Sequence, residues 1–259
     1  MTMTKTLATL AAVGTVAFAG TANAAFLTDW YVDPTGSGSA VQVSEYLDLN
    51  GTSYIQNTFS SATQFSFNQV GSYITNLADS ITPVSPMIST FIGSGIGDTT
   101  SGFSFTSGSL SVSAGGTTIA TFNLVSGNGF LNGSTIPNGL VSLSFEATYL
   151  AEGYFFADAA LTDDLALRDT VLGFTTTNAS NLVNWNAATN STLTGLWNDN
   201  FDPDVAGIQN NGNTHLVIGN NGQFRLEERI NQVPEPASLA LLGLGLIGLG
   251  AVRRKQAAK

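Results

Sequence analysis

The feature that most constrains the fold of this chain is a two-residue alternation of apolar and polar side chains. In the stretch LVSLSFEATYL, Val141, Leu143 and Phe145 alternate with two serines and a glutamate. This period puts the apolar side chains on one face of a strand and the polar ones on the other. Similar runs occur in VQVSEYLDL, TQFSFNQV, SGFSFTSGSLSVSAGGTTIATFNLVSG and LVIGNNGQFRLEERI. We therefore expect an all-β fold, a single antiparallel β-sandwich with a jelly roll as one form of it.

Three kinds of segment depart from this plain strand pattern. Asn221-Gly222 is a strong hairpin signal and predicts a turn between the last two strands. Residues 178–213 contain ten asparagines among 36 residues, which predicts a long loop region. The stretches FNQVGSYITNLAD and ALTDDLALRD are the places where we expect short helical segments.

The charge and composition of residues 25–233 exclude several classes of protein. This segment has three arginines and no lysine against seventeen carboxylates, so it repels the phosphates of nucleic acids. The chain has no cysteine, which excludes disulfides and thiolate zinc sites. His215 is the only histidine, so a histidine-based zinc site or a catalytic triad is hard to assemble. We interpret His215 as an ordinary strand residue.

The N-terminal region has the three parts of a secretory signal peptide. Lys5 is followed by an apolar run at residues 7–19 and then by small residues that include Ala22 and Ala24. Such a peptide needs a charged start, a short apolar core and small side chains at the cleavage site. We expect residues 1–24 to be a signal peptide that signal peptidase removes after Ala24.

The C-terminal region combines an apolar run with a basic end. Residues 237–252 carry no charge. As a helix they reach about 24 Å, slightly less than the hydrocarbon core of a bilayer. The basic residues 253–255 follow immediately and, by the positive-inside rule, stay cytoplasmic. We expect a transmembrane helix at about 237–252 that holds the chain transiently in the inner membrane.

A short motif precedes this apolar run. The motif residues of the tail are Pro234, Glu235, Pro236, Arg253 and Arg254. The prolines disfavour helix before the span and leave an extended peptide at the membrane surface. This order resembles the PEP-CTERM sorting signal, which implies recognition by an exosortase and release or transfer to the cell surface or extracellular matrix. The chain then divides into a signal peptide, 1–24, a mature β-rich domain, 25–233, and a sorting signal, 234–259.

Two further stretches carry a second resemblance. The start of the mature domain, AFLTDWYVDPTGSGSAVQVSEYLDLNGTSYIQNTF, and the later GYFFAD resemble PEP-CTERM proteins associated with bacterial flocculation. The resemblance implies a protein that supports flocculation and biofilm formation together with extracellular polysaccharide, and it gives no catalytic residues to carry over. Separately, we expect residues 25–233 to fold without a required cofactor.

The asparagine-rich region supplies candidate binding residues. Trp185 and Trp197 lie in it, and exposed tryptophan faces beside amides are typical of sugar-binding surfaces. The alternative is that both tryptophans are core anchors. Asp199, Asp202 and Asp204 lie close together in the same region and predict a calcium site, because calcium takes several oxygen ligands. The alternative here is a solvated acidic turn.

Two other functions compete with the matrix role. The first is a lectin-like domain that binds carbohydrate. The second is a glycan-active hydrolase with a pair of carboxylates such as Glu146 and Glu152. A hydrolase needs such a pair across a cleft, about 5 to 9.5 Å apart. Nothing in the sequence identifies such a pair, and we therefore expect no enzyme.

Overall fold

The computed structural model describes residues 24–131, 138–168, 171–181, 187–209 and 214–229. Ala22, Trp185, the PEP motif and the predicted transmembrane helix therefore lie outside the described residues. Within these ranges, no helix is both long enough and apolar enough to cross a membrane.

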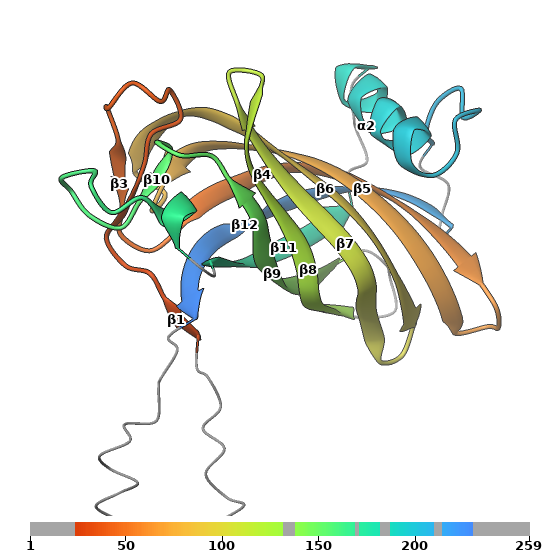
Figure 1. Cartoon of the computed structure of the whole chain (residues 1–259). Coiled ribbons are helices and arrows are strands. Elements are labelled where there is room, and N and C mark those ends of the chain that lie inside the picture. The colour runs from red at the N-terminus through yellow and green to blue at the C-terminus, as the bar shows by residue number, and fades with distance from the viewer. Residues whose placement is uncertain (1–23, 132–137, 169–170, 182–186, 210–213, 230–259) are drawn as a thin grey trace, which may run out of the picture. The chain divides into compact units, whose positions relative to one another are not determined.

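A single antiparallel sheet dominates the structure and closes on itself (Figure 1). Its eight wall strands are β4 (Leu47–Phe59), β5 (Gln64–Ala78), β6 (Thr82–Asp98), β7 (Gly102–Ala114), β8 (Thr117–Leu131), β9 (Asn138–Leu150), β11 (Val171–Asn181) and β12 (His215–Arg229). Strand β12 pairs with β11 on one side and with β4 on the other, which closes the barrel. The all-β antiparallel prediction is confirmed.

The predicted sandwich, however, is wrong, because one continuous sheet surrounds the core instead of two sheets facing each other. The wall strands are long, up to 17 residues in β6. Long twisted strands coil a sheet, and closure lets its first and last strands pair and removes both free edges. Alternation along each strand is the same in a sandwich and in a barrel, so it did not distinguish them.

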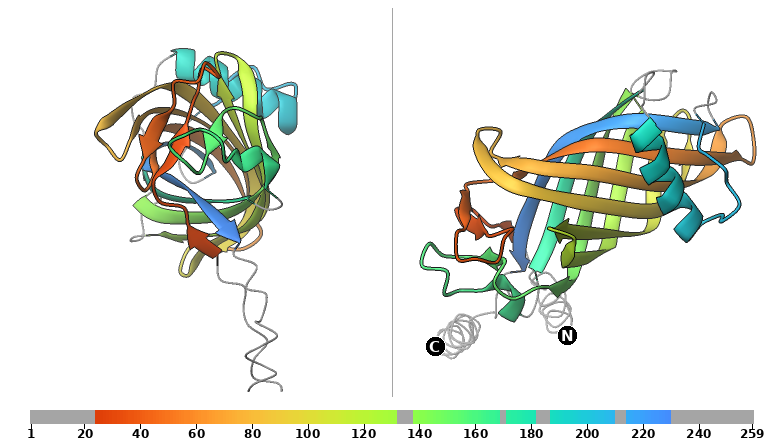
Figure 2. Two further views of the ribbon diagram at one scale, coloured as in Figure 1. Left: turned by 60° about the vertical axis from the view of Figure 1, so that its left-hand side comes forward. Right: turned by 90° about the horizontal axis from the view of Figure 1, so that it is seen from above.

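One end of the barrel is covered by small elements, and we call it the plugged end. These are β2 (Trp30–Val32), β3 (Val41–Val43), β10 (Phe155–Phe156) and the 3-10 turn η1 (Leu165–Leu167). Strands β10, β2 and β3 form a second sheet, which lies across the barrel mouth (Figure 2). Strand β1 (Ala24–Phe26) extends the main sheet beside β12. Trp30, Val32 and Phe155 are buried in the same core cluster as the barrel interior.

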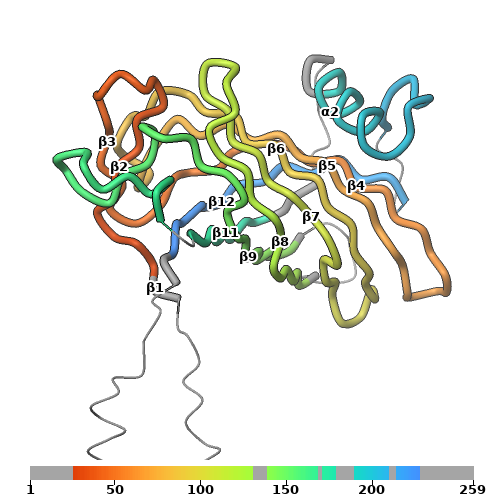
Figure 3. Tube along the Cα trace, in the orientation of Figure 1, coloured from red at the N-terminus to blue at the C-terminus, as the bar shows by residue number. Residues whose placement is uncertain are grey.

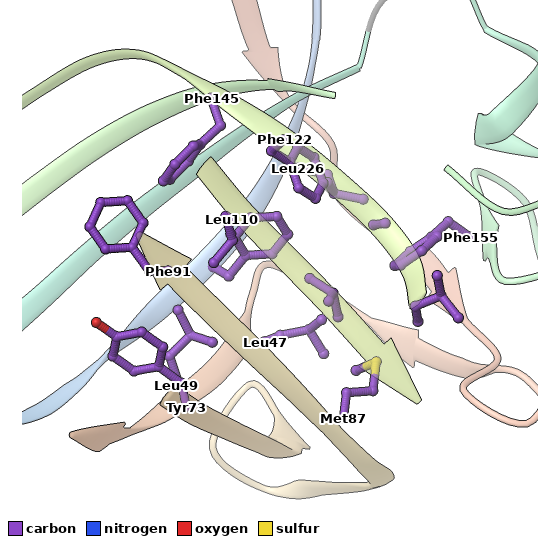
Figure 4. Close-up of a cluster of buried hydrophobic side chains, with 14 of the residues drawn as sticks. Leu47, Leu49, Tyr73, Met87, Phe91, Leu110, Phe122, Phe145, Phe155 and Leu226 are labelled. Carbon is purple, nitrogen blue, oxygen red and sulfur yellow. The ribbon is translucent and has the colours of Figure 1, made fainter. Parts of the chain in front are cut away.

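The barrel interior is packed mainly with aromatic and aliphatic side chains (Figure 4). Phe91 lies edge-on to Phe105 and to Phe145, with ring centroids 5.5 Å and 6.2 Å apart. Glycines make room for these rings. A Cβ atom at Gly95, for example, would collide with the Phe67 ring from the neighbouring strand. The core is therefore built from rings that lie over strand positions without side chains.

Strand β6 has glycines on its core-facing side and isoleucines on its outer side. Its small residues Gly93 and Gly95 are buried, whereas Ile88 and Ile96 on the alternate positions are 54% and 59% exposed. The rings from neighbouring strands already fill the interior, so the larger isoleucines take the outer face. Ile92, also on that face, is covered by the helix described next.

The helix α2 (Ala187–Asn200) lies outside the barrel against β4 and β5 (Figure 3). Leu193 and Trp197 of the helix form a second core cluster with Tyr54 and Val217 of the wall. A helix thus replaces part of the long loop predicted for residues 178–213, because the cluster gives its apolar face a surface to bury.

Two other local predictions are corrected, and a third is confirmed in part. Asn221 and Gly222 lie inside the continuous strand β12 and pair with β11 and β4 on either side, so no hairpin turn forms there. A Cβ at Gly222 would collide with the Thr176 carbonyl, which explains a glycine at this position. FNQVGSYITNLAD belongs to strand β5. ALTDDLALRD contains only the 3-10 turn η1.

Candidate functional site

An open groove of about 640 Å³ lies at the end of the barrel opposite the plug. We call this end of the barrel the open end, and we call the groove the end groove. The β4–β5 turn, the β6–β7 turn and the last residues of β8 line it. Its lining residues are Ser60, Gln64, Phe65, Ser66, Ile96, Gly97, Asp98, Ser101, Gly102, Phe103, Ser104, Asn128, Gly129 and Phe130. Hydroxyl and amide groups therefore surround a few apolar side chains.

Phe130 is the most exposed aromatic side chain of the end groove. It is 68% exposed at the end of β8, where it pairs with Leu140 of β9. Close by, the Ser104 hydroxyl donates to the Asn128 Oδ1 at 3.0 Å, which orients that amide. An exposed ring beside oriented polar groups offers both a stacking surface and hydrogen-bonding partners.

Asp98 is the single carboxylate among the described residues that line the end groove. The Thr100 hydroxyl donates to its Oδ1 at 2.6 Å and the Thr63 hydroxyl to its Oδ2 at 3.0 Å. Hydrogen bonds from the Thr100 side chain and backbone, and from Thr63, lower the pKa of Asp98 below its ordinary value of 3.8. Asp98 is therefore ionised at neutral pH and serves as a hydrogen-bond acceptor.

Two small cavities lie behind the end groove, inside the barrel. The first has a volume of about 40 Å³ and the second about 70 Å³. Ile55, Gln69, Phe103 and Leu216 line both cavities. Phe103 also lines the groove, so its ring borders all three spaces.

Trp197, a predicted sugar-binding residue, packs between helix and barrel. Its side chain is only 2% exposed, and its ring centroid lies 4.8 Å from that of Tyr54 and 4.7 Å from that of Phe201. Burial raises the pKa of Tyr54 to about 12, so this phenol stays neutral. The ring faces of Trp197 are occupied, which agrees with the core-anchor alternative for this residue.

A pocket of about 170 Å³ lies beside Trp197, at the edge of the α2 interface. Gln56, Asp202 and His215 contribute polar groups to it. His215 Nε2 lies 3.3 Å from Gln56 Nε2, and the imidazole stacks on Tyr54 with centroids 6.2 Å apart. His215 does lie on a strand, as predicted, at the first position of β12.

The three aspartates predicted to bind calcium lie near one another in the chain, one on α2 and two in the turn that follows this helix. Asp199 is exposed on α2, and Asp202 follows the helix with its Oδ1 accepting from the Asp204 backbone N–H at 3.1 Å. Among the described residues, no group of three or more His, Cys, Asp or Glu side chains is arranged to hold a metal ion. Calcium binding by these residues stays a prediction.

The carboxylates considered for hydrolysis lie away from the end groove. Glu146 is exposed on β9, and Glu152 is exposed in the segment that follows this strand toward the plugged end. Neither lines the groove. The groove residues themselves come from separate turns and strand ends, so no local motif in the sequence pointed to them.

Comparison with known proteins identifies the C-terminal region. Residues 232–255 match the model of the PEP-CTERM protein-sorting motif. No curated protein and no solved structure matches the chain. The matched residues include the Pro234-Glu235-Pro236 tripeptide and the basic pair Arg253 and Arg254. The chain therefore carries a PEP-CTERM sorting motif, which implies export, sorting by an exosortase and a location at the cell surface or outside the cell.

Proposed function

We propose that the protein is a surface or matrix component that supports flocculation and biofilm formation by binding extracellular polysaccharide through its end groove. The observation that carries the proposal is the groove itself, about 640 Å³ in volume and rich in hydroxyl and amide groups. The sorting motif supports it, because sorting places the barrel outside the cell, where such polysaccharide is found.

The chemistry of the groove suits a sugar chain. Sugar hydroxyls need both donors and acceptors, and the Ser104–Asn128 pair and the Asp98 carboxylate are examples of such groups. The exposed Phe130 ring offers a face for the C–H side of a pyranose. The groove is open, so a polymer can lie across it without threading its ends through the protein.

The groove supports binding better than hydrolysis. Hydrolysis of a glycosidic bond uses two carboxyl groups that flank the bond. Among the described lining residues the groove presents one, Asp98, and the hydrogen bonds on Asp98 keep it ionised and unsuited to act as a general acid. Retention of the sugar chain is therefore the proposed activity.

A single substitution in the groove tests the binding role. Phe130→Ala is expected to weaken polysaccharide binding about tenfold, because loss of a stacked ring removes roughly 1 to 1.5 kcal/mol. The measurement is co-sedimentation of the purified full-length chain with polysaccharide from the producing cells. Leu167→Ala is the matched control, since Leu167 is 72% exposed at the plugged end. Equal binding by wild type and Phe130→Ala contradicts the groove assignment.

A deletion strain tests the matrix role separately. Flocculation and polysaccharide yield are scored independently in the same cultures. We expect the strain to lose flocculation and keep its yield, because a protein that holds polysaccharide in place does not make it. Unchanged flocculation contradicts the matrix role even if the purified protein binds sugar.

A further inference from the structure

The interior cavity nearest the end groove is small and mostly apolar. Its volume is about 40 Å³, and its lining residues are Ile55, Asn57, Phe65, Phe67, Gln69, Phe103 and Leu216. A cavity of this size admits a group of a few heavy atoms and is too small for a sugar ring. The second cavity, of about 70 Å³, shares the lining residues Ile55, Gln69, Phe103 and Leu216 with it.

Two phenylalanines stand between this cavity and the groove. Phe65 and Phe103 line both the groove and the cavity. Phe103 is only half-buried and meets Phe67 edge-on, with ring centroids 5.5 Å apart. A group bound in the groove therefore reaches the cavity by passing these two rings.

The lining of the cavity selects the kind of group that fits. A bare pyranose has hydroxyls around its ring, and burying one among phenylalanine and leucine side chains without a partner is costly. A short acyl group differs, because its methyl end is apolar and its carbonyl needs only one donor. The Gln69 side chain lines the cavity and its amide carries N–H donors of the type a carbonyl accepts.

We infer that the end groove recognises acetylated polysaccharide, with an acetyl substituent of the sugar seated past Phe65 and Phe103 in the cavity beside Gln69. This inference rests on the proposed function, because the acetyl group enters from a sugar chain already held in the groove. It adds a specificity for acetyl substitution that the groove surface alone does not provide.

Paired probes test the inference. Titration calorimetry compares acetylated glucomannan oligosaccharides with the same oligosaccharides after alkaline deacetylation, against the purified full-length chain. Both probes are uncharged, so the acidic character of the protein does not bias the comparison. We expect the acetylated probe to bind about tenfold more tightly, from burial of one methyl and one hydrogen bond.

Two variants locate the effect. Leu216→Phe fills the cavity and is expected to abolish the preference for the acetylated probe while leaving the affinity for the deacetylated probe unchanged. Gln69→Leu keeps the volume of the side chain and removes its N–H donors. It is therefore expected to reduce the preference for the acetylated probe without abolishing it. Leu167→Phe, the same change at an exposed site of the plugged end, is the control. Circular dichroism of each variant establishes that it folds.

The outcomes separate the inference from the function it builds on. Equal binding of both probes by the wild-type chain overturns the acetyl inference and leaves polysaccharide binding in the groove standing. Binding of neither probe overturns the inference and counts against the groove as a sugar site. A preference that Leu216→Phe leaves intact in a folded variant places the acetyl group elsewhere and also overturns the inference.

Discussion

The two ends of the same barrel wall have opposite characters. The described acidic residues at or beside the plugged end are Asp29, Asp33, Glu45, Asp48, Asp79, Glu152, Asp158, Asp163, Asp164 and Glu227. The end groove at the other end is lined by one acidic residue, Asp98, among hydroxyl and amide groups. Most of the carboxylates among the described residues therefore lie away from the surface proposed to bind polysaccharide.

Many of the carboxylates at the plugged end organise loops. Asp33 accepts hydrogen bonds from the backbone N–H groups of Thr35, Gly38 and Ser39. Asp79 accepts from the backbone N–H groups at 44, 45 and 46. In a chain without cysteine, these contacts take the place of disulfides in fixing short loops. Carboxylates at the plugged end thus fix loops of the protein, whereas Asp98 and the Ser104–Asn128 pair at the open end are also bonded within the protein but line a groove that is open to solvent.

The largest expected effect concerns the core of the plug. Trp30→Ala should lower the free energy of unfolding by about 3 to 5 kcal/mol, because Trp30 is fully buried and packs against Phe155. Trp30→Phe should cost much less, since the indole Nε1 has no hydrogen-bond partner among the described residues. Denaturant unfolding measures both. A small loss in Trp30→Ala contradicts the view that the plug is part of the core.

The next effect concerns the helix outside the barrel. Trp197→Ala should detach α2 at a cost of about 3 kcal/mol, because Trp197 fills the interface with Tyr54 and Phe201. Hydrogen exchange in α2 measures the detachment, and Asp199→Ala on the same helix is the control. Polysaccharide binding should be unchanged. Loss of binding without loss of helix protection restores Trp197 as a sugar-binding residue.

A smaller effect on stability, which depends on pH, is expected from the loops of the plugged end. Burial alone would raise the pKa of Asp79, but hydrogen bonds from Ser44, Tyr46 and Glu45 outweigh it and lower the pKa below 3.8. A carboxyl group with a depressed pKa in the folded state stabilises above its unfolded pKa, and this stabilisation is lost as the pH falls through the folded value. Wild type should therefore lose stability below about pH 4.

Asp79→Asn tests the origin of that loss. The variant should be about 1 kcal/mol less stable than wild type at pH 7, after allowance for solvent screening, and the difference should shrink in acid. Asp29→Asn is the matched control, because Asp29 and Asp79 both have positive φ, 57° and 51°, which asparagine also tolerates. Thermal unfolding from pH 7 to pH 3 measures the difference. A constant difference over this range contradicts the assignment to Asp79.

The smallest effect is expected from calcium. Chelation should lower the melting temperature only slightly, because among the described residues Asp199, Asp202 and Asp204 form no ready-made metal cluster. Asp202→Ala with Asp204→Ala should remove that small dependence. Calorimetric titration without binding above background, together with unchanged melting in chelator, contradicts the calcium prediction.

Local patterns in the sequence were sufficient for some features and misleading for others. Alternation along residues 141–149 correctly predicted a strand, because a two-residue period is a property of the strand itself. Asn221-Gly222 predicted a turn that does not form, since pairing with strands on both sides holds it extended. The isoleucines of β6 look like core residues, yet Ile88 and Ile96 are exposed because aromatic rings from other strands fill the interior.

The candidate site shows the same contrast between what local sequence patterns predict and what the tertiary structure decides. Trp197 and the aspartates were singled out because they lie close together in the chain, whereas the residues of the end groove are scattered from Ser60 to Phe130. No short window of sequence contains them. Only the pairing of distant strands brings their turns to one end, so their proximity is a consequence of barrel closure.

The sequence by itself determined that the chain is built from antiparallel strands and that it carries a PEP-CTERM sorting motif. Both are local properties, the first a repeat along a strand and the second a linear signal read as a peptide. Tertiary structure alone decided that the sheet closes, that one end is plugged, and that the other holds a groove with cavities behind it. These features depend on which distant strands pair and on how side chains from different strands share the interior, and no single stretch of sequence encodes either.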